Sequence, residues 1–68
     1  MTPVNSGAIR AVGHDPSNGT LMIQFASGET YHYAGVPRHV HDALLTADSP
    51  GKHFHANIRG QYPHEKKS

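Results

Sequence analysis

A chain of 68 residues has room for one small domain, and its composition excludes several classes of protein. Hydrophobic residues make up 35% of the chain and charged residues 16%, which fits neither a membrane protein nor a highly charged disordered chain. The chain contains no cysteine, which excludes disulfides and thiolate metal sites, and a formal net charge of +1 does not by itself indicate a nucleic-acid binder.

The first half of the chain is expected to form three antiparallel strands. Residues 1–7 are polar and expected to be loose, whereas residues 8–14 form a short apolar run that ends at a turn containing Asn-Gly. Residues 20–25 alternate apolar and polar side chains, and residues 30–34 are rich in threonine and tyrosine, as strands are. Because the intervening loops are short, the three strands should pair in sequence as a meander.

The second half changes to a helical period. Pro37 suits the first position of a helix, and Val40, Leu44 and Ala47 fall on one stripe of it.

A second helix is expected to follow immediately. Ser49 is placed to cap it and Pro50 to begin it, with Phe54 and Ile58 on its buried edge. Gly60 suits a left-handed cap at its end.

These elements predict an α+β fold of order β-β-β-α-α, with both helices on one face of a three-stranded meander. Residues 8–63 would form the single domain, and residues 64–68 a frayed tail. The expected core consists of Ile9, Val12, Leu21, Ile23, Phe25, Tyr31, Tyr33, Val36, Val40, Leu44, Leu45, Phe54, Ile58 and Tyr62.

Taken together, these residues resemble the KTSC domain, a module found at the C-terminus of some lysyl-tRNA synthetases and as a free-standing bacterial or phage protein. The resemblance runs from about Asn5 to Pro63 and implies a nucleic-acid-associated role, without implying an established activity. It rests on Ala11-Val12-Gly13 followed by Asp15, on Leu21, Ile23 and Phe25, on Ser27-Gly28, Tyr31-x-Tyr33, Gly35-Val36-Pro37 and Ala43-Leu44-Leu45, and on Gly51-Lys52-x-Phe54, Asn57-Ile58-Arg59 and Tyr62-Pro63.

Tyr31 and Tyr33 lie on one side of their strand and admit two interpretations. They could stack against nucleic-acid bases, or they could be core tyrosines with wet hydroxyl groups. If residues 26–28 form a three-residue loop with Gly28 left-handed, both tyrosines share a face with the apolar side chains of the preceding strand. If Ser27 and Gly28 form a two-residue turn, they stand on the opposite face. Composition slightly favours the first arrangement.

The cationic residues that could contact phosphates are Arg10, Arg38, Lys52 and Arg59, together with Lys66 and Lys67 of the tail. The alternative is that these residues belong to an ordinary solvated surface with no binding role, which is the commoner case for surface charges.

Histidine pairs invite a metal hypothesis that their spacing does not support. His39 with His41 and His53 with His55 are each two residues apart in segments read as helical, so the rings of a pair point in different directions. We therefore expect no metal and no cofactor. No serine, histidine or aspartate forms a recognisable nucleophile–base pattern, so we expect no enzymatic activity.

The resulting hypothesis is a small nucleic-acid-binding accessory domain that prefers RNA to DNA, using Tyr31, Tyr33, Arg10, Arg38, Lys52 and Arg59. The alternative is a protein-interaction module, such as a phage or host regulator, that presents the second helix or an open sheet edge to a partner. No segment is apolar enough for a signal peptide or membrane span, and a cytoplasmic location is expected.

Overall fold

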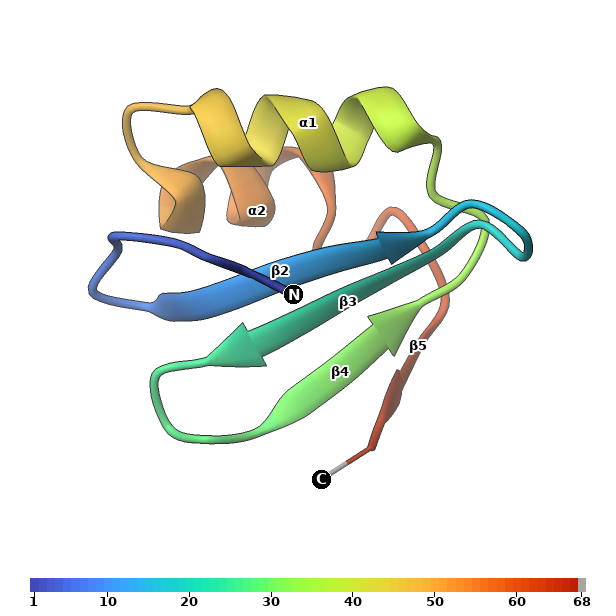
Figure 1. Cartoon of the computed structure of the whole chain (residues 1–68), viewed down its shortest axis with the longest axis horizontal. Helices are drawn as coiled ribbons and strands as arrows, with labels where there is room; N and C mark the ends of the chain where they lie inside the picture. Colours follow the sequence, from blue (N-terminus) through green and yellow to red (C-terminus); the bar gives the residue numbers. More distant parts are fainter. Residues whose placement is uncertain (68) are drawn as a thin grey trace.

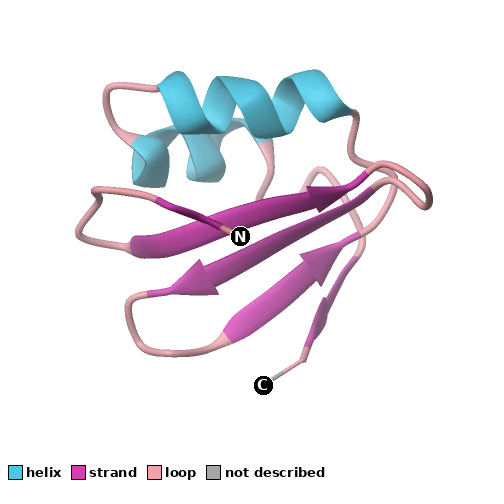
Figure 2. Cartoon of the chain, in the orientation of Figure 1, coloured by secondary structure: helices cyan, strands magenta, loops and turns pink. Residues whose placement is uncertain are grey.

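A five-stranded antiparallel sheet with two helices on one face makes up the fold in a computed structural model that describes residues 1–67 (Figures 1 and 2). The α+β class and the order of meander and helices are confirmed, with two more strands than expected. The strands are β1 (Thr2–Pro3), β2 (Ile9–Asp15), β3 (Thr20–Phe25), β4 (Thr30–Tyr33) and β5 (His64–Lys66), and the helices are α1 (Arg38–Thr46) and α2 (Pro50–Asn57).

The turn between β3 and β4 determines which side chains of β4 face the helices. Gly28 has a φ of 97°, and its N–H donates to the carbonyl of Phe25 at 2.9 Å. This is the left-handed geometry of the three-residue loop, and it places Tyr31 opposite Ile23 and Tyr33 opposite Leu21. The two-residue turn, which would put both tyrosines on the outer face, is therefore wrong.

The two additional strands come from the ends of the chain. Residues 1–7 and the tail were expected to be loose and frayed, but β1 pairs with β2, and β5 pairs with β4. These segments lack the alternation of a strand, and their pairing arises because the outer edges of β2 and β4 present unpaired N–H and C=O groups. Ser68, the last residue of that tail, lies outside the described residues.

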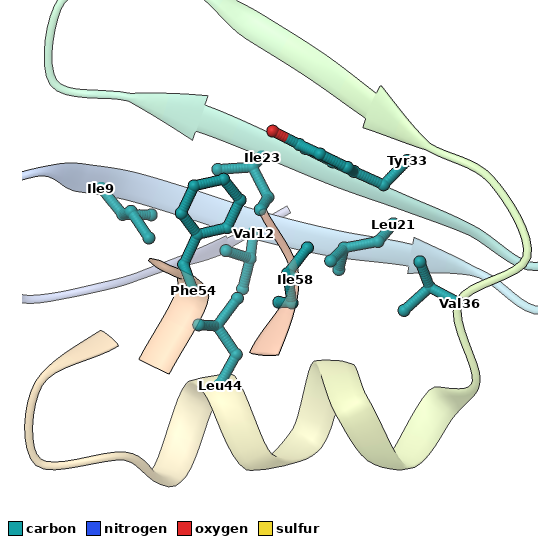
Figure 3. Close-up of a cluster of buried hydrophobic side chains, with 9 residues drawn as sticks. All are labelled: Ile9, Val12, Leu21, Ile23, Tyr33, Val36, Leu44, Phe54 and Ile58. Atoms are coloured by element: carbon teal, nitrogen blue, oxygen red, sulfur yellow. The ribbon is translucent and has the colours of Figure 1, made fainter. Parts of the chain in front are cut away.

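The core lies between the helices and the helix-facing side of the sheet, as Figure 3 shows. Leu44 points from α1 toward the sheet, and Phe54 and Ile58 fill the space beside it. Every expected core residue is either buried or packed against this cluster, and Val4 joins it as an addition. The nine buried hydrophobic residues are Ile9, Val12, Leu21, Ile23, Tyr33, Val36, Leu44, Phe54 and Ile58.

The helices begin and end near the expected residues. Pro37 precedes α1, and Pro50 is the first residue of α2 after Ser49. The expected capping bond from the Ser49 side chain is absent. The backbone carbonyl of Ser49 accepts the first helical hydrogen bond, from His53 N–H at 3.0 Å, as an N-cap carbonyl does with or without a side-chain cap. Gly60 has a φ of 78°, as expected for the turn that ends α2. Neither helix within residues 1–67 is long and apolar enough to cross a membrane.

A histidine connects the sheet to the start of α1. His14 Nε2 lies 2.7 Å from the carbonyl oxygen of Val36, and because a carbonyl only accepts, this nitrogen carries the proton. His14 Nδ1 is buried and has no hydrogen-bond partner among the described residues. The contact holds the segment between β4 and α1 against β2.

Candidate functional site

A pocket of about 420 Å³ opens where the helices leave the β4–β5 side of the sheet uncovered. α1 packs against β2 and α2, whereas β5 forms the sheet edge next to β4 (Figure 1). The pocket is lined by Ala8, Ile9, Phe25, Glu29, Tyr31, Tyr33, Gly51, Phe54, His55, Arg59, Gly60 and His64. It therefore joins the end of the sheet to α2 and to the turn that follows α2.

Two tyrosines of β4 form one wall of this pocket. Tyr31 and Tyr33 are two residues apart on an extended strand, so their rings project to the same side, with centroids 6.5 Å apart and planes inclined by 30°. Tyr33 is 4% exposed and belongs to the core, whereas Tyr31 is half-buried. Both therefore face the core side, and Tyr31 is the one that combines an aromatic face with access to a ligand.

Phenylalanine side chains hold the two tyrosine rings in place. Phe25 meets Tyr31 edge-on at 5.6 Å between centroids, and Phe54 meets Phe25 and Tyr33 edge-on at 5.4 Å and 5.6 Å. Such edge-to-face contacts are favourable because the positive edge of one ring meets the negative face of the next. His64 of β5 lies against both tyrosines, 5.7 Å from Tyr31 and 5.4 Å from Tyr33. The aromatic wall is thus fixed by packing from three strands and α2.

The positive side of the pocket is built at the end of α2. The N–H groups of Ile58 and Arg59 both donate to the carbonyl of Phe54 at 2.9 Å, and the left-handed Gly60 then reverses the chain. Arg59 Nη1 donates to Nδ1 of His55 at 3.2 Å. That bond occupies one of the five N–H donors of the guanidinium, so others are available for an anion.

The hydroxyl of a core tyrosine and an exposed ion pair complete the electrostatics of the pocket. Burial raises the pKa of Tyr33, and nearby Tyr31 adds to this effect while the positive charge of Arg59 opposes it. Tyr33 is therefore a neutral hydrogen-bonding group at physiological pH. Glu29 Oε2 lies 2.6 Å from Lys66 Nζ, and the hydrogen bond and charge of Lys66 lower the pKa of Glu29. Glu29 is thus an ionised acceptor at the pocket.

The structure brings together three of the six residues proposed from the sequence: Tyr31, Tyr33 and Arg59. Lys52 is exposed on α2 beside Gly51, which lines the pocket, and Arg10 donates to the carbonyl of Ala26 at 3.2 Å. Neither lines the pocket itself.

Arg38 lies apart, at the start of α1, where its Nε is 3.6 Å from Asp42 Oδ1. The cationic residues are therefore dispersed rather than gathered on one surface.

Sequence reasoning missed Glu29, His55 and His64 as members of the site. His55 and Arg59 are four residues apart, a spacing that places side chains on one helix face, and this signal was available. No sequence signal pointed to Glu29 or His64. His64 reaches the pocket only because β5 pairs with β4.

The side chains of His39 and His41 diverge, as their helical spacing requires. His39 is exposed, whereas His41 is 7% exposed and lies 2.9 Å from Asp42 through Nδ1. Within residues 1–67, no group of three or more histidine, aspartate or glutamate side chains is arranged to hold a metal ion.

Comparisons with known proteins agree on one family. The family model described as the KTSC domain matches residues 5–62. The crystal structure of a KTSC domain protein from Yersinia pestis superposes with a TM-score of 0.94 at 39% identity, covering 98% of this chain and 94% of that one.

Two sequence relatives differ greatly in length. An uncharacterized protein of Stutzerimonas stutzeri is 41% identical over 59 residues, which cover 87% of this chain and 83% of the relative. A lysine–tRNA ligase of Nostoc sp. is 40% identical over 60 residues, which cover 88% of this chain but 11% of the ligase.

Proposed function

The chain belongs to the KTSC domain family, and we propose that it is an accessory module that binds nucleic acid, RNA in preference to DNA, without catalysing a reaction. The observation that carries this proposal is that Tyr31 and Arg59 line the same pocket, where Phe25 packs against the Tyr31 ring. An aromatic face can stack on any base, at about 1–3 kcal/mol per base, and a guanidinium can pair with a phosphate.

Two observations favour RNA over DNA. The name of the Nostoc relative, lysine–tRNA ligase, refers to an enzyme that acts on tRNA, and a segment of that enzyme matches most of this chain. Glu29 also lines the pocket, and an ionised carboxylate accepts a hydrogen bond from a ribose 2′-hydroxyl, which DNA lacks. Single strands are favoured over duplexes because bases in a duplex are already stacked.

The test is a fluorescence-anisotropy titration of labelled oligonucleotides of one length at low salt. Single-stranded RNA should bind with a Kd of about 10⁻⁵–10⁻⁴ M, within the range of sequence-independent binding, and more tightly than single-stranded DNA or duplex RNA. Failure of the wild-type chain to bind any of them at about 10⁻⁴ M would end the proposal.

Two arginine variants locate the binding surface. Arg59→Gln removes the cation at the pocket and should weaken RNA binding about tenfold, the cost of a charge-assisted hydrogen bond. Arg38→Gln removes the same charge from an exposed side chain at the start of α1, so it should change the affinity less than about twofold. Equal effects of the two substitutions would show that RNA binds by net charge and not at the pocket.

The alternative, a protein-interaction module, has less support from the sheet than expected. Its edges were expected to be open, but they are formed by β1 and β5, strands of two and three residues. Such short edges give an added strand little to pair with. The exposed side of α2 remains available for this alternative, and the oligomeric state across a dilution series tests self-association.

A further inference from the structure

We propose that the pocket binds a single unpaired nucleotide, with its base stacked on Tyr31 and its phosphate paired with Arg59, and that it does not bind several consecutive bases. This inference rests on the proposed function, because it names the part of the RNA that the site takes. It follows from the size of the pocket and from the distribution of rings and charges around it.

The volume is that of a small-ligand site. About 420 Å³ lies in the lower part of the range of roughly 300–1,000 Å³ that ligand pockets occupy. Tyr31 presents its ring from one side while Phe54 and His55 approach from α2. A planar base is enclosed there on more than one side, whereas an open sheet surface would carry several bases in a row.

Aromatic side chains are concentrated at this one place. The sequence holds three tyrosines, two phenylalanines and no tryptophan, and four of these five residues line the pocket. The fifth, Tyr62, is half-buried against the core outside the pocket lining. A second hollow of about 380 Å³, beside His32 and Lys67, is lined by no phenylalanine or tyrosine. A neighbouring base would therefore find only the smaller imidazole rings of His32 and His64 in that second hollow.

The charges at the pocket also match one nucleotide. Among residues 1–67, Arg59 is the one lysine or arginine in its lining, so the site offers a full positive charge to a single phosphate. Glu29 pairs with Lys66 through Oε2 at 2.6 Å and accepts from Ser27 through Oε1 at 3.3 Å, and the remaining lone pairs of the carboxylate can accept hydrogen bonds from ribose hydroxyls or base amino groups. One phosphate contact gives a single-stranded complex a log–log salt slope of about −0.7, or a loss of about threefold between 50 and 200 mM salt.

The experiment is an NMR titration of the full ¹⁵N-labelled chain with adenosine 5′-monophosphate, ribose 5-phosphate and inorganic phosphate, in parallel with single-stranded RNA. The nucleotide should shift the amides of Tyr31, Gly51 and Gly60, and it should compete with RNA. Its base protons should move upfield through the ring current of Tyr31 and show cross-relaxation to that ring in the wild-type chain. Ribose 5-phosphate and phosphate should bind at least fivefold more weakly, since they lack the stacked base.

Tyrosine variants supply the matched controls. Tyr31→Leu should weaken nucleotide binding about fivefold or more, and Tyr31→Phe should preserve it because the ring remains. Tyr62→Leu makes the same chemical change outside the pocket and should leave the affinity unchanged. The wild-type cross-relaxation signals decide the question if the leucine variants do not fold.

The outcomes separate this inference from the proposed function. If RNA binds but the mononucleotide neither binds nor competes, the single-nucleotide site is wrong and the RNA-binding function stands. If the mononucleotide binds through Tyr31 and RNA does not bind, the site stands and the function is wrong. Equal affinity for the nucleotide and for ribose 5-phosphate would overturn the role given to Tyr31, and binding of none of these ligands would overturn both proposals.

Discussion

Substituting Gly28 by alanine isolates the cost of one backbone conformation. Gly28 has a φ of 97° in the turn between β3 and β4, a region that L side chains rarely adopt. Gly7 provides a matched control, because a Cβ atom added at either glycine meets no heavy atom within 4 Å, and Gly7 is not left-handed. Alanine therefore clashes with nothing at either position, and only the local backbone differs.

The size of the effect follows from this comparison. Both substitutions restrict the unfolded chain equally, which should stabilise Gly7→Ala by about 0.4–1 kcal/mol. Gly28→Ala also carries the left-handed penalty, so it should be about 1–2 kcal/mol less stable than Gly7→Ala. For a domain of this size, 1 kcal/mol moves Tm by about 4–8 °C.

Urea unfolding followed by far-UV circular dichroism measures this difference, with Tm as a second reading. A synthetic chain with D-alanine at position 28 should be at least as stable as the wild type, because a D-residue favours a positive φ. If Gly28→Ala and Gly7→Ala have the same stability, the left-handed turn does not constrain the chain and the stated origin of the β3–β4 register is wrong.

Two further predictions concern the core and the C-terminal strand. Leu44→Ala removes a fully buried side chain from between α1 and the sheet and should lower the free energy of unfolding by about 2–5 kcal/mol. The same change at half-buried Leu45 should lower it less. Urea unfolding measures both variants, and equal losses of stability would contradict the assigned burial. Lys66 lowers the pKa of Glu29 below 4.5, so the stability that this pair gives β5 is present above that pH and is lost as pH falls through the folded-state pKa. An NMR titration of the Glu29 carboxyl carbon should show its midpoint rise toward 4.5 in Lys66→Gln, and an unchanged midpoint would remove Lys66 as the cause.

Much of the fold could be predicted because local patterns agreed with the final packing. Alternation in residues 20–25 identified β3, and composition already slightly favoured the correct register of β4. β1 and β5 could not be predicted in this way, because two or three polar residues carry no periodicity. Their pairing depends on edges that exist only after β2 and β4 have formed.

The candidate site was predicted in part for a related reason. Choosing between core and exposed tyrosines assumed that a side chain on the core face is fully covered, whereas Tyr31 lies on that face, is half-buried and lines the pocket. The sequence identified the arginines as candidate phosphate contacts, but it could not predict where their side chains lie in the fold. That placement depends on chain reversals such as the turn at Gly60. Arg38 and Arg59 are alike in sequence, but Arg38 pairs with Asp42 on α1 and Arg59 lines the pocket.

The pocket draws its lining from residues as far apart as Ala8 and His64, so it exists only in the folded chain. Binding and folding are therefore thermodynamically linked, and a ligand that occupies the pocket raises the apparent stability of the whole domain by RT ln(1 + [L]/Kd). At ten times Kd this gain is about 1.4 kcal/mol, a substantial fraction of the marginal stability of so short a chain. Even a weak ligand should thus be detectable as thermal protection.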